Sequence, residues 1–226
     1  MVVTLLHGFL QDGRAWDELV ARLPAEWTFE RPHLLGQSSP ASAAELVTGR
    51  SHLVGYSMGG RLALWIAVRH PERVLSVTTI GAHAGLEPGE RAQRAAADAA
   101  LAERIEREGM DWFATYWAAQ PMFSRLAGRT DLDAMRRAQD PAAVAATLRG
   151  LGPAAVEPFW DRLGAISVPG LFIAGAEDGR YPGLARRLAA AVPHGRAEIV
   201  PGAGHAVHLE RPDEVARLLR AHLSTR

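Results

Sequence analysis

The 226-residue sequence contains no cysteine, lysine or asparagine. The absence of cysteine excludes disulfides, catalysis by a thiolate and cysteine-bound zinc, and it fits an enzyme of the cytoplasm. All 25 basic residues are arginine, and they balance 25 acidic residues to a formal net charge of zero. Because no global field attracts polyanions, we expect neither nucleic acid nor a membrane surface as a partner.

Long apolar runs are also absent. Nothing approaches the roughly 20 apolar residues that span a bilayer. The opening run, Val2–Leu6, is too short for a signal peptide and has no basic leader. Hydrophobic residues still make up 48% of the sequence, which allows a sizeable core. The sequence therefore predicts one globular domain over residues 1–226, located in the cytoplasm; no oligomeric state follows from it.

Short apolar runs of strand length alternate along the chain with amphipathic stretches of helical period. Strands are expected at Val2–Leu6, Thr28–Arg31, His52–Gly55, Val74–Ile80, Gly170–Ala174 and Arg196–Val200. Helices are expected at Ala15–Leu23, Gly59–His70, Leu184–Val192 and Pro212–Leu223. This alternation predicts an α/β fold, with a mostly parallel six-stranded sheet and helices on both faces.

One long segment breaks the alternation. From Pro88 to Leu163 the sequence is rich in alanine, arginine and leucine and has no convincing strand pattern. We therefore expect a helical insertion over approximately residues 86–163. Because it directly follows the strand Val74–Ile80, we interpret it as a cap over a site at the strand ends. The alternative is a helical subdomain that only adds stability.

The segment Gly55-Tyr56-Ser57-Met58-Gly59 has the pattern G-x-S-x-G and lies between a predicted strand and a predicted helix. A sharp turn there needs small residues on both sides, so that the hydroxyl of Ser57 projects. The N–H of Met58 would begin the following helix, where free amide donors and the helix dipole favour an anion. Ser57 is therefore the candidate reactive residue and Met58 a candidate oxyanion donor; a chance turn is the alternative.

His7-Gly8-Phe9 follows the first predicted strand. If this segment meets the serine turn, the backbone N–H of Phe9 can complete an oxyanion hole with Met58. An ordinary turn at a strand end is the alternative interpretation.

Two further loops supply candidate partners for Ser57. Asp178 and Glu177 follow the strand Gly170–Ala174, where a carboxylate can orient an imidazole, and we favour Asp178. His205 follows the last strand on a glycine loop, where it can act as general base.

The order of these residues supports the assignment. Ser57, Asp178 and His205 occur in the chain order typical of hydrolases with a serine elbow. His208 begins to approach the closing helix and is assigned a structural role. The nine histidines show no metal-ligand spacing, so we predict no metal and no cofactor.

With these motifs in place, the sequence resembles the α/β-hydrolase superfamily. Its longer segments resemble the MenH family, the 2-succinyl-6-hydroxy-2,4-cyclohexadiene-1-carboxylate synthases of menaquinone biosynthesis. The likeness covers nearly the whole chain, and the elbow with Arg61 and the segment Trp117–Phe123 are its more specific parts. The resembling segments are Leu6–Phe9, Gly55–Arg61, Gly85-Leu86 with Glu90-Arg91, Trp117–Phe123, Gly175–Asp178 and Gly202–His205.

The resemblance implies an elimination instead of a hydrolysis. The substrate that it implies is a small polycarboxylate, a cyclohexene that carries an enolpyruvyl ether and a succinyl group. The serine, held by histidine and aspartate, acts as the base, pyruvate leaves, and a cyclohexadiene remains. Arginines must then hold the carboxylates of the substrate, a task that suits bidentate guanidinium pairing.

The resemblance also points to the residues that would bind this substrate. Arg61 lies one turn into the helix after Ser57 and can face the same cleft. The match leaves Arg136 and Arg137 ambiguous by one residue. Tyr56 places a hydroxyl beside Ser57, where it either contacts the substrate or only packs. The complete set of candidates is Tyr56, Arg61, Arg94, Trp117, Gln120, Arg136 and Arg137.

Some segments depart from the superfamily pattern and leave other functions open. His33–Ser38 stands where an Asp-x-x-Gly-His-Gly loop is usual, Pro40–Arg50 is short for a helix, and a leading hairpin is missing. One alternative is a carboxylesterase or C–C bond hydrolase with Ser57 as nucleophile, and another is a non-catalytic ligand-binding protein on the same scaffold. An arginine-lined pocket would favour the synthase, an apolar pocket the esterase, and an intact triad would argue against the binding protein.

Overall fold

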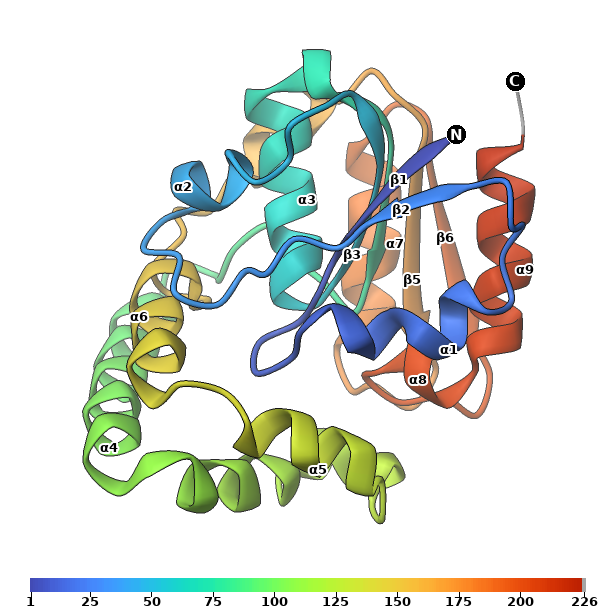
Figure 1. Ribbon diagram of the computed structural model, residues 1–226. Coiled ribbons are helices and arrows are strands. Elements are labelled where there is room, and N and C mark those ends of the chain that lie inside the picture. The colour runs from blue at the N-terminus through green and yellow to red at the C-terminus, as the bar shows by residue number, and fades with distance from the viewer. Residues whose placement is uncertain (225–226) are drawn as a thin grey trace.

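The computed structural model describes residues 1–224 and contains one central sheet. Its neighbours follow the order β2-β1-β3-β4-β5-β6, and every pairing within the described chain is parallel (Figure 1). The strands are β1 (Val2–Leu6), β2 (Thr28–Glu30), β3 (Ser51–Tyr56), β4 (Val74–Ile80), β5 (Gly170–Gly175) and β6 (Gly195–Val200). The six predicted strands are therefore confirmed to within a residue at either end, and the carboxyl ends of all six face the same edge.

Helices cover both faces of the sheet, because alternate residues of each buried strand point to opposite sides. Val3 and Leu5 belong to a core that includes α1 (Asp17–Val20) and α9 (Pro212–Leu223). Leu6 belongs to a second core on the other face. That core includes the helices α2 (Pro40–Ala44), α3 (Met58–Arg69) and α7 (Tyr181–Ala191).

The first predicted helix, Ala15–Leu23, is shorter in the structure than expected. A 3-10 turn, η1 (Gly13–Trp16), leads into only one turn of α-helix, α1. The next residues bond three positions back, from the Arg22 N–H to the Leu19 carbonyl and from the Leu23 N–H to the Val20 carbonyl. Pro24 also prevents the helix from continuing past this point, because the residue before a proline is disfavoured in the α conformation.

The chain between β4 and β5 folds entirely into helices and turns within the described residues. They are α4 (Arg91–Ala118), η3 (Pro121–Leu126), α5 (Thr130–Arg137), α6 (Pro141–Leu151) and η4 (Trp160–Ala165). The helix α4 breaks at Gly109, whose φ of +76° is non-helical. Figure 1 shows α4, α5 and α6 gathered beyond the end of the sheet at which β1 finishes. No helix in residues 1–224 is long and apolar enough to cross a membrane.

Candidate active site

Ser57 occupies the sharp junction between β3 and α3. Its φ of +49° lies in the left-handed region, which is rare for a residue with a side chain and marks strain at a functional turn. Its backbone N–H donates to the Ile80 carbonyl at 2.8 Å. A side chain at Gly55 would overlap the backbone of Gly59, and one at Gly59 would overlap the backbone of Leu6. Only glycine fits on either side, so the turn presents the hydroxyl of Ser57 at the strand ends.

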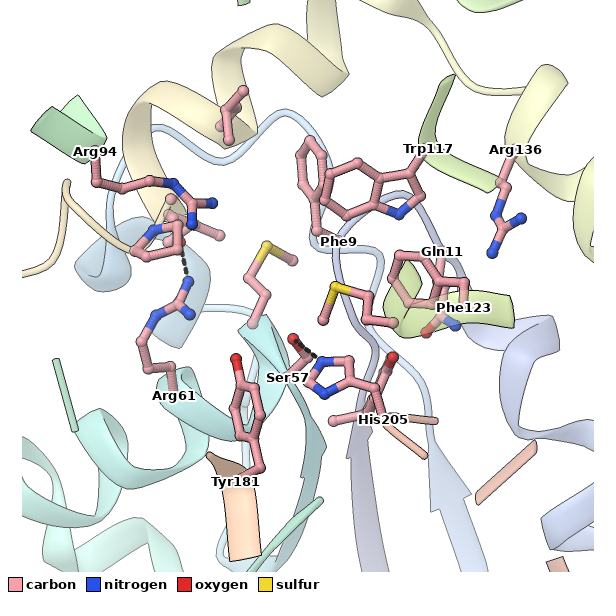
Figure 2. A pocket seen from close by; sticks show the side chains of 17 residues that line it. Phe9, Gln11, Ser57, Arg61, Arg94, Trp117, Phe123, Arg136, Tyr181 and His205 are labelled. Carbon is pink, nitrogen blue, oxygen red and sulfur yellow. Dashed lines mark hydrogen bonds between the residues drawn. The ribbon is translucent and has the colours of Figure 1, made fainter. Parts of the chain in front are cut away.

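His205 lies between Ser57 and Asp178 and is bonded to both. Its Nδ1–H donates to Asp178 Oδ2 at 2.7 Å. Its Nε2 accepts from the Ser57 hydroxyl at 3.1 Å, the bond drawn between these two residues in Figure 2. His205 and Asp178 are both buried. Glu177 instead points outward and pairs with Arg125 at the surface. The loops therefore bring together the three residues that the sequence singled out, with the aspartate in the orienting position.

His208 is buried in a different environment from His205. Its ring lies 4.6 Å from that of Trp16 and 4.4 Å from that of Tyr56, centroid to centroid. Burial lowers its pKa from 6.5 to about 3, so this imidazole is neutral. Both ring nitrogens lack a hydrogen-bond partner within the described chain, which agrees with a packing role.

The loop after β1 is fixed by His7. The His7 Nδ1–H donates to the Gly8 carbonyl at 2.8 Å, and its Nε2 accepts from the Leu34 N–H at 2.9 Å. Burial lowers the pKa of His7 to about 4 and so keeps the ring neutral. A neutral imidazole can donate from one nitrogen and accept at the other, as these two bonds require. The loop places Phe9 in the wall of the pocket that Ser57 and Met58 also line. Phe9 and Met58, the two residues predicted to supply amide donors, thus line the same pocket as Ser57.

The pocket around Ser57 is bounded by the sheet edge on one side and by the helical insertion on the other. Figure 2 shows Arg61 and Arg94 at one end of it and Arg136 at the other, with Ser57 and His205 between them. Its remaining wall is largely apolar and includes Phe9, Met58, Trp117, Met122, Phe123, Leu148 and Leu151. The pocket therefore combines an apolar centre with cationic ends.

Arg61 is a buried cation without a carboxylate partner among the described residues. Only 6% of its surface is exposed. Its Nη2 donates to the Leu151 carbonyl at 2.6 Å, whereas its Nε has no partner there. Burial lowers its pKa to about 10, so the guanidinium still carries its charge near neutral pH. An unpaired buried charge is costly, and an anion in the pocket would relieve that cost.

Arg136, at the opposite end, is equally buried and also lacks a carboxylate partner within residues 1–224. Its guanidinium lies over the ring of Phe123 at 5.6 Å from the centroid. Arg94 differs, because it is half-exposed and its Nε donates to Asp98 at 2.7 Å. The pocket is thus lined by Arg61 and Arg136, which have no carboxylate partner in the described chain, and by Arg94, which is paired with Asp98.

Two of the predicted substrate-binding residues lie elsewhere. Arg137 is outside the pocket, where its guanidinium bonds Asp133 at 2.8 Å and Asp111 at 2.9 Å. Consecutive helical residues point in different directions, so α5 cannot turn both of its arginines inward. Gln120 also misses the pocket, because its amide donates to the Tyr116 carbonyl at 3.1 Å and closes the end of α4.

The remaining candidates line the pocket in different ways. Trp117 packs edge-on against Phe9 at 5.2 Å between ring centroids. Tyr56 is 3% exposed, and its hydroxyl is buried without a hydrogen-bond partner in the described chain. Burial raises the pKa of Tyr56 well above 10, so the phenol stays protonated.

Sequence reasoning missed Tyr181 and Gln11. Tyr181 stands three residues after Asp178, and its ring lies 4.6 Å from that of His205. Figure 2 shows its hydroxyl pointing between Arg61 and Ser57. Burial raises the pKa of Tyr181, which keeps the hydroxyl available as a donor. Its place at the first turn of α7, directly after a strand-end carboxylate, is the signal that could have identified it.

The described residues contain no group of three or more histidine and carboxylate side chains able to hold a metal ion. The chemistry that the site can perform within this set of residues is proton transfer between Ser57 and His205. Cations lie at both ends of the pocket.

Comparisons with known proteins show the family and fold to which the chain is similar. The model of the alpha/beta hydrolase family matches residues 5–218. A 2-succinyl-6-hydroxy-2,4-cyclohexadiene-1-carboxylate synthase of Enterobacter sp. (strain 638) is 32% identical, over 99% of this chain and 92% of that protein. The structure of MenH from S. aureus has a TM-score of 0.90 at 25% identity and covers 99% of this chain and 93% of that one. A thermophilic esterase from Thermogutta terrifontis has a TM-score of 0.83 at 25% identity, with 99% and 89% covered.

Proposed function

The chain belongs to the alpha/beta hydrolase family and, within it, to the family of 2-succinyl-6-hydroxy-2,4-cyclohexadiene-1-carboxylate synthases, and on that premise we propose that it eliminates pyruvate from an enolpyruvyl-succinyl-cyclohexene carboxylate. The product is the cyclohexadiene that gives the family its name. We further propose that it acts in the cytoplasm, where proteins without disulfides are common.

The observation that carries the proposal is the pair of unpartnered buried arginines at the two ends of the pocket. Arg61 and Arg136 each keep a guanidinium out of solvent with no carboxylate of the described chain to neutralise it. A substrate with carboxylates at separated positions would supply both missing charges. A neutral ester would supply neither, so the charge arrangement favours a polycarboxylate.

The reaction begins with removal of a ring proton. The acidic proton is the one next to the succinyl carbonyl, because its removal spreads negative charge onto the carbonyl oxygen. Ser57 takes this proton while its own hydroxyl proton passes to Nε2 of His205, and Asp178 stabilises the imidazolium through Nδ1. The electron pair becomes a new ring double bond, the original ring double bond shifts by one position, and the ring's bond to the enolpyruvyl oxygen breaks. The His205 imidazolium returns its proton to the departing enolpyruvate, which tautomerises to pyruvate, and His205 is neutral again.

The amide donors would act on the charge that develops during proton removal. In this proposal the N–H groups of Phe9 and Met58, which line the pocket with Ser57, donate to the carbonyl oxygen of the succinyl group as it becomes an enolate. Each such donor contributes about 3 kcal/mol to the transition state when it is correctly aimed. The positive end of α3 adds to the same stabilisation.

The helical insertion, approximately residues 86–163, acts in this proposal as a cap. It supplies Arg94, Trp117, Phe123 and Arg136 to the pocket, while the sheet edge supplies Ser57. Because it carries part of the charge-binding wall, the cap would exclude water and position the substrate at the same time.

A direct assay tests the proposal. The enolpyruvyl-succinyl-cyclohexene carboxylate is supplied to the purified protein, and pyruvate release is followed with a coupled lactate dehydrogenase. We expect turnover in the wild type and a loss of at least about 1,000-fold in Ser57→Ala, because a required proton acceptor is removed. Absence of pyruvate release from the folded wild type would refute the proposed reaction.

A carboxylesterase that uses Ser57 as nucleophile is the second candidate, favoured by the hydrogen bond from the serine to His205. p-Nitrophenyl acetate turnover, measured in parallel, separates the two: fast ester hydrolysis without pyruvate release would support the esterase. The third possibility, a binding protein without catalysis, predicts that Ser57→Ala changes no measured turnover, whereas both enzymes predict its loss.

A further inference from the structure

The loop that carries His205 consists mostly of glycine and alanine, whose small side chains can do little to hold its conformation. It runs as Pro201-Gly202-Ala203-Gly204-His205-Ala206 between β6 and the short helix α8 (Val207–Glu210). Gly202 has a φ of +63°, so the turn depends on glycine. The imidazole must nevertheless align one nitrogen with Ser57 and the other with Asp178. Alignment of both nitrogens requires that the backbone on either side of the histidine be held from outside the loop.

Glu210 makes the contacts that can hold it. Its Oε2 accepts from the Gly204 N–H at 2.7 Å, and its Oε1 accepts from the Ala206 N–H at 3.0 Å. These two amides belong to the residues immediately before and after His205. One carboxylate therefore bridges the backbone on both sides of the histidine, with one oxygen for each amide. Bonds from amides to a carboxylate are stronger than those between neutral groups.

The carboxylate is itself held in place. The Glu210 side chain is 4% exposed, and its backbone N–H donates to the Ala206 carbonyl at 3.0 Å. Arg125 Nε lies 3.9 Å from Oε2 and provides a cationic neighbour. Glu210 does not line the pocket, so its route to the chemistry runs only through His205.

We propose that Glu210 is a positioning residue for His205. By fixing the amides of Gly204 and Ala206, it keeps the imidazole within hydrogen-bonding distance of Ser57 and Asp178. Any reaction that deprotonates Ser57 needs the same alignment of His205 with Ser57 and Asp178. The inference therefore rests on the proposed function only in the experiment that measures pyruvate release.

Three variants test this role. Glu210→Ala removes both acceptors, and we expect kcat for pyruvate release to fall about 10- to 100-fold, since small misplacements of reacting groups have effects of this size. KM is expected to stay within about twofold of the wild-type value, because positioning of His205 affects the chemical step and not substrate binding. Glu210→Gln keeps one acceptor oxygen and should lie between the two. Glu214→Ala, which removes an exposed carboxylate of α9 that pairs with Arg217, is the matched control and should leave kcat unchanged.

A second readout does not depend on the natural substrate. A fluorophosphonate phosphonylates an activated serine, so its rate of reaction with Ser57 reports the Ser57–His205 geometry directly. We expect the rate constant to fall in Glu210→Ala and Glu210→Gln in the same order as kcat. If the wild type is labelled but releases no pyruvate, the proposed function fails while Glu210 is still tested.

Two labelling results would overturn the positioning role. One is a wild-type labelling rate in a folded Glu210→Ala protein. The other applies if Glu210→Ala does not fold: a wild-type labelling rate in Glu210→Gln, whose side chain keeps the same size. A change in KM as large as the change in kcat would also contradict it, because Glu210 would then be acting on substrate binding.

Discussion

Arg136 and Arg137 are consecutive in α5, yet they lie in opposite environments. Arg136 is buried in the pocket without a carboxylate partner in the described chain, and Arg137 is bonded to Asp133 and Asp111 at the surface. The chain thus offers two cations of equal charge, one residue apart, of which only one can meet a substrate.

The pair gives a matched test of the carboxylate-binding role. We expect Arg136→Ala to raise KM for the synthase substrate about 10- to 100-fold, because hydrogen bonds to charged groups contribute about 1.5–3 kcal/mol. Arg137→Ala removes the same charge and should change KM by less than about twofold, as for other exposed ion pairs. Steady-state kinetics of both variants measure the two changes in KM. Equal changes would mean that long-range electrostatic attraction, and not contact with Arg136, sets the affinity for the substrate.

Arg61 should show a conflict between stability and function. In Arg61→Met, an apolar side chain of similar length replaces a buried cation whose Nε has no partner in the described chain. We expect the free energy of unfolding to rise by about 1 kcal/mol, since apolar replacement of buried charges is often stabilising. Pyruvate release at low substrate concentration should fall at the same time. Urea unfolding and kcat/KM measure the two quantities, and a destabilised variant would show that Arg61 is held for structural reasons.

Tyr181→Phe removes one oxygen from the pocket and leaves the ring against His205 in place. We expect kcat/KM to fall about fivefold to tenfold, since a typical hydrogen bond contributes about 1 kcal/mol and one to a charged group somewhat more. Tyr116, an exposed residue of α4, gives the control Tyr116→Phe. Unchanged kinetics in Tyr181→Phe would show that the hydroxyl makes no bond to the substrate.

The buried histidines should make stability fall in mild acid. Burial lowers the pKa of His208 and of His83 from 6.5 to about 3, and that of His7 to about 4. Below pH 6.5 the unfolded chain binds protons that the folded chain does not. Their contribution to stability is therefore complete above pH 6.5 and is lost as the pH falls toward the folded-state values.

The size of this effect can be measured by urea unfolding between pH 7 and pH 4.5. Each such histidine adds about 1.4 kcal/mol per pH unit to the slope once its unfolded form is protonated. His208→Phe should reduce the slope by about that amount, and His194→Phe, at an exposed position, serves as the control. A slope that His208→Phe leaves unchanged would contradict the linkage.

The strands and the residues around the reactive serine could be predicted from the sequence because their causes are local. Val74–Ile80 is rich in β-branched residues, which favour strands, and its predicted and observed ends coincide. Ser57 stands between glycines that only a tight turn requires. Asp178 and His205 each follow a strand, and parallel strands bring such residues to one edge.

Other features could not be predicted from the apolar pattern. The first predicted helix was too long, since the observed α-helix is the single turn α1. Gln120 was assigned to the pocket, but the turn at the end of α4 directs its amide to the Tyr116 carbonyl. Tyr181 was missed because the helix was predicted to begin at Leu184, whereas α7 begins at Tyr181.

The sequence by itself determined the scaffold, the serine turn and the order of Ser57, Asp178 and His205, because these follow from strand period, glycine sterics and the shared edge of a parallel sheet. Tertiary structure alone decided that Arg136, and not Arg137, faces the pocket. The sequence gives every arginine the same charge, but burial and the positions of carboxylates differ among them. Arg137 meets Asp133 and Asp111 and is neutralised at the surface, whereas Arg61 and Arg136 meet no carboxylate of the described chain and keep their charge for a ligand.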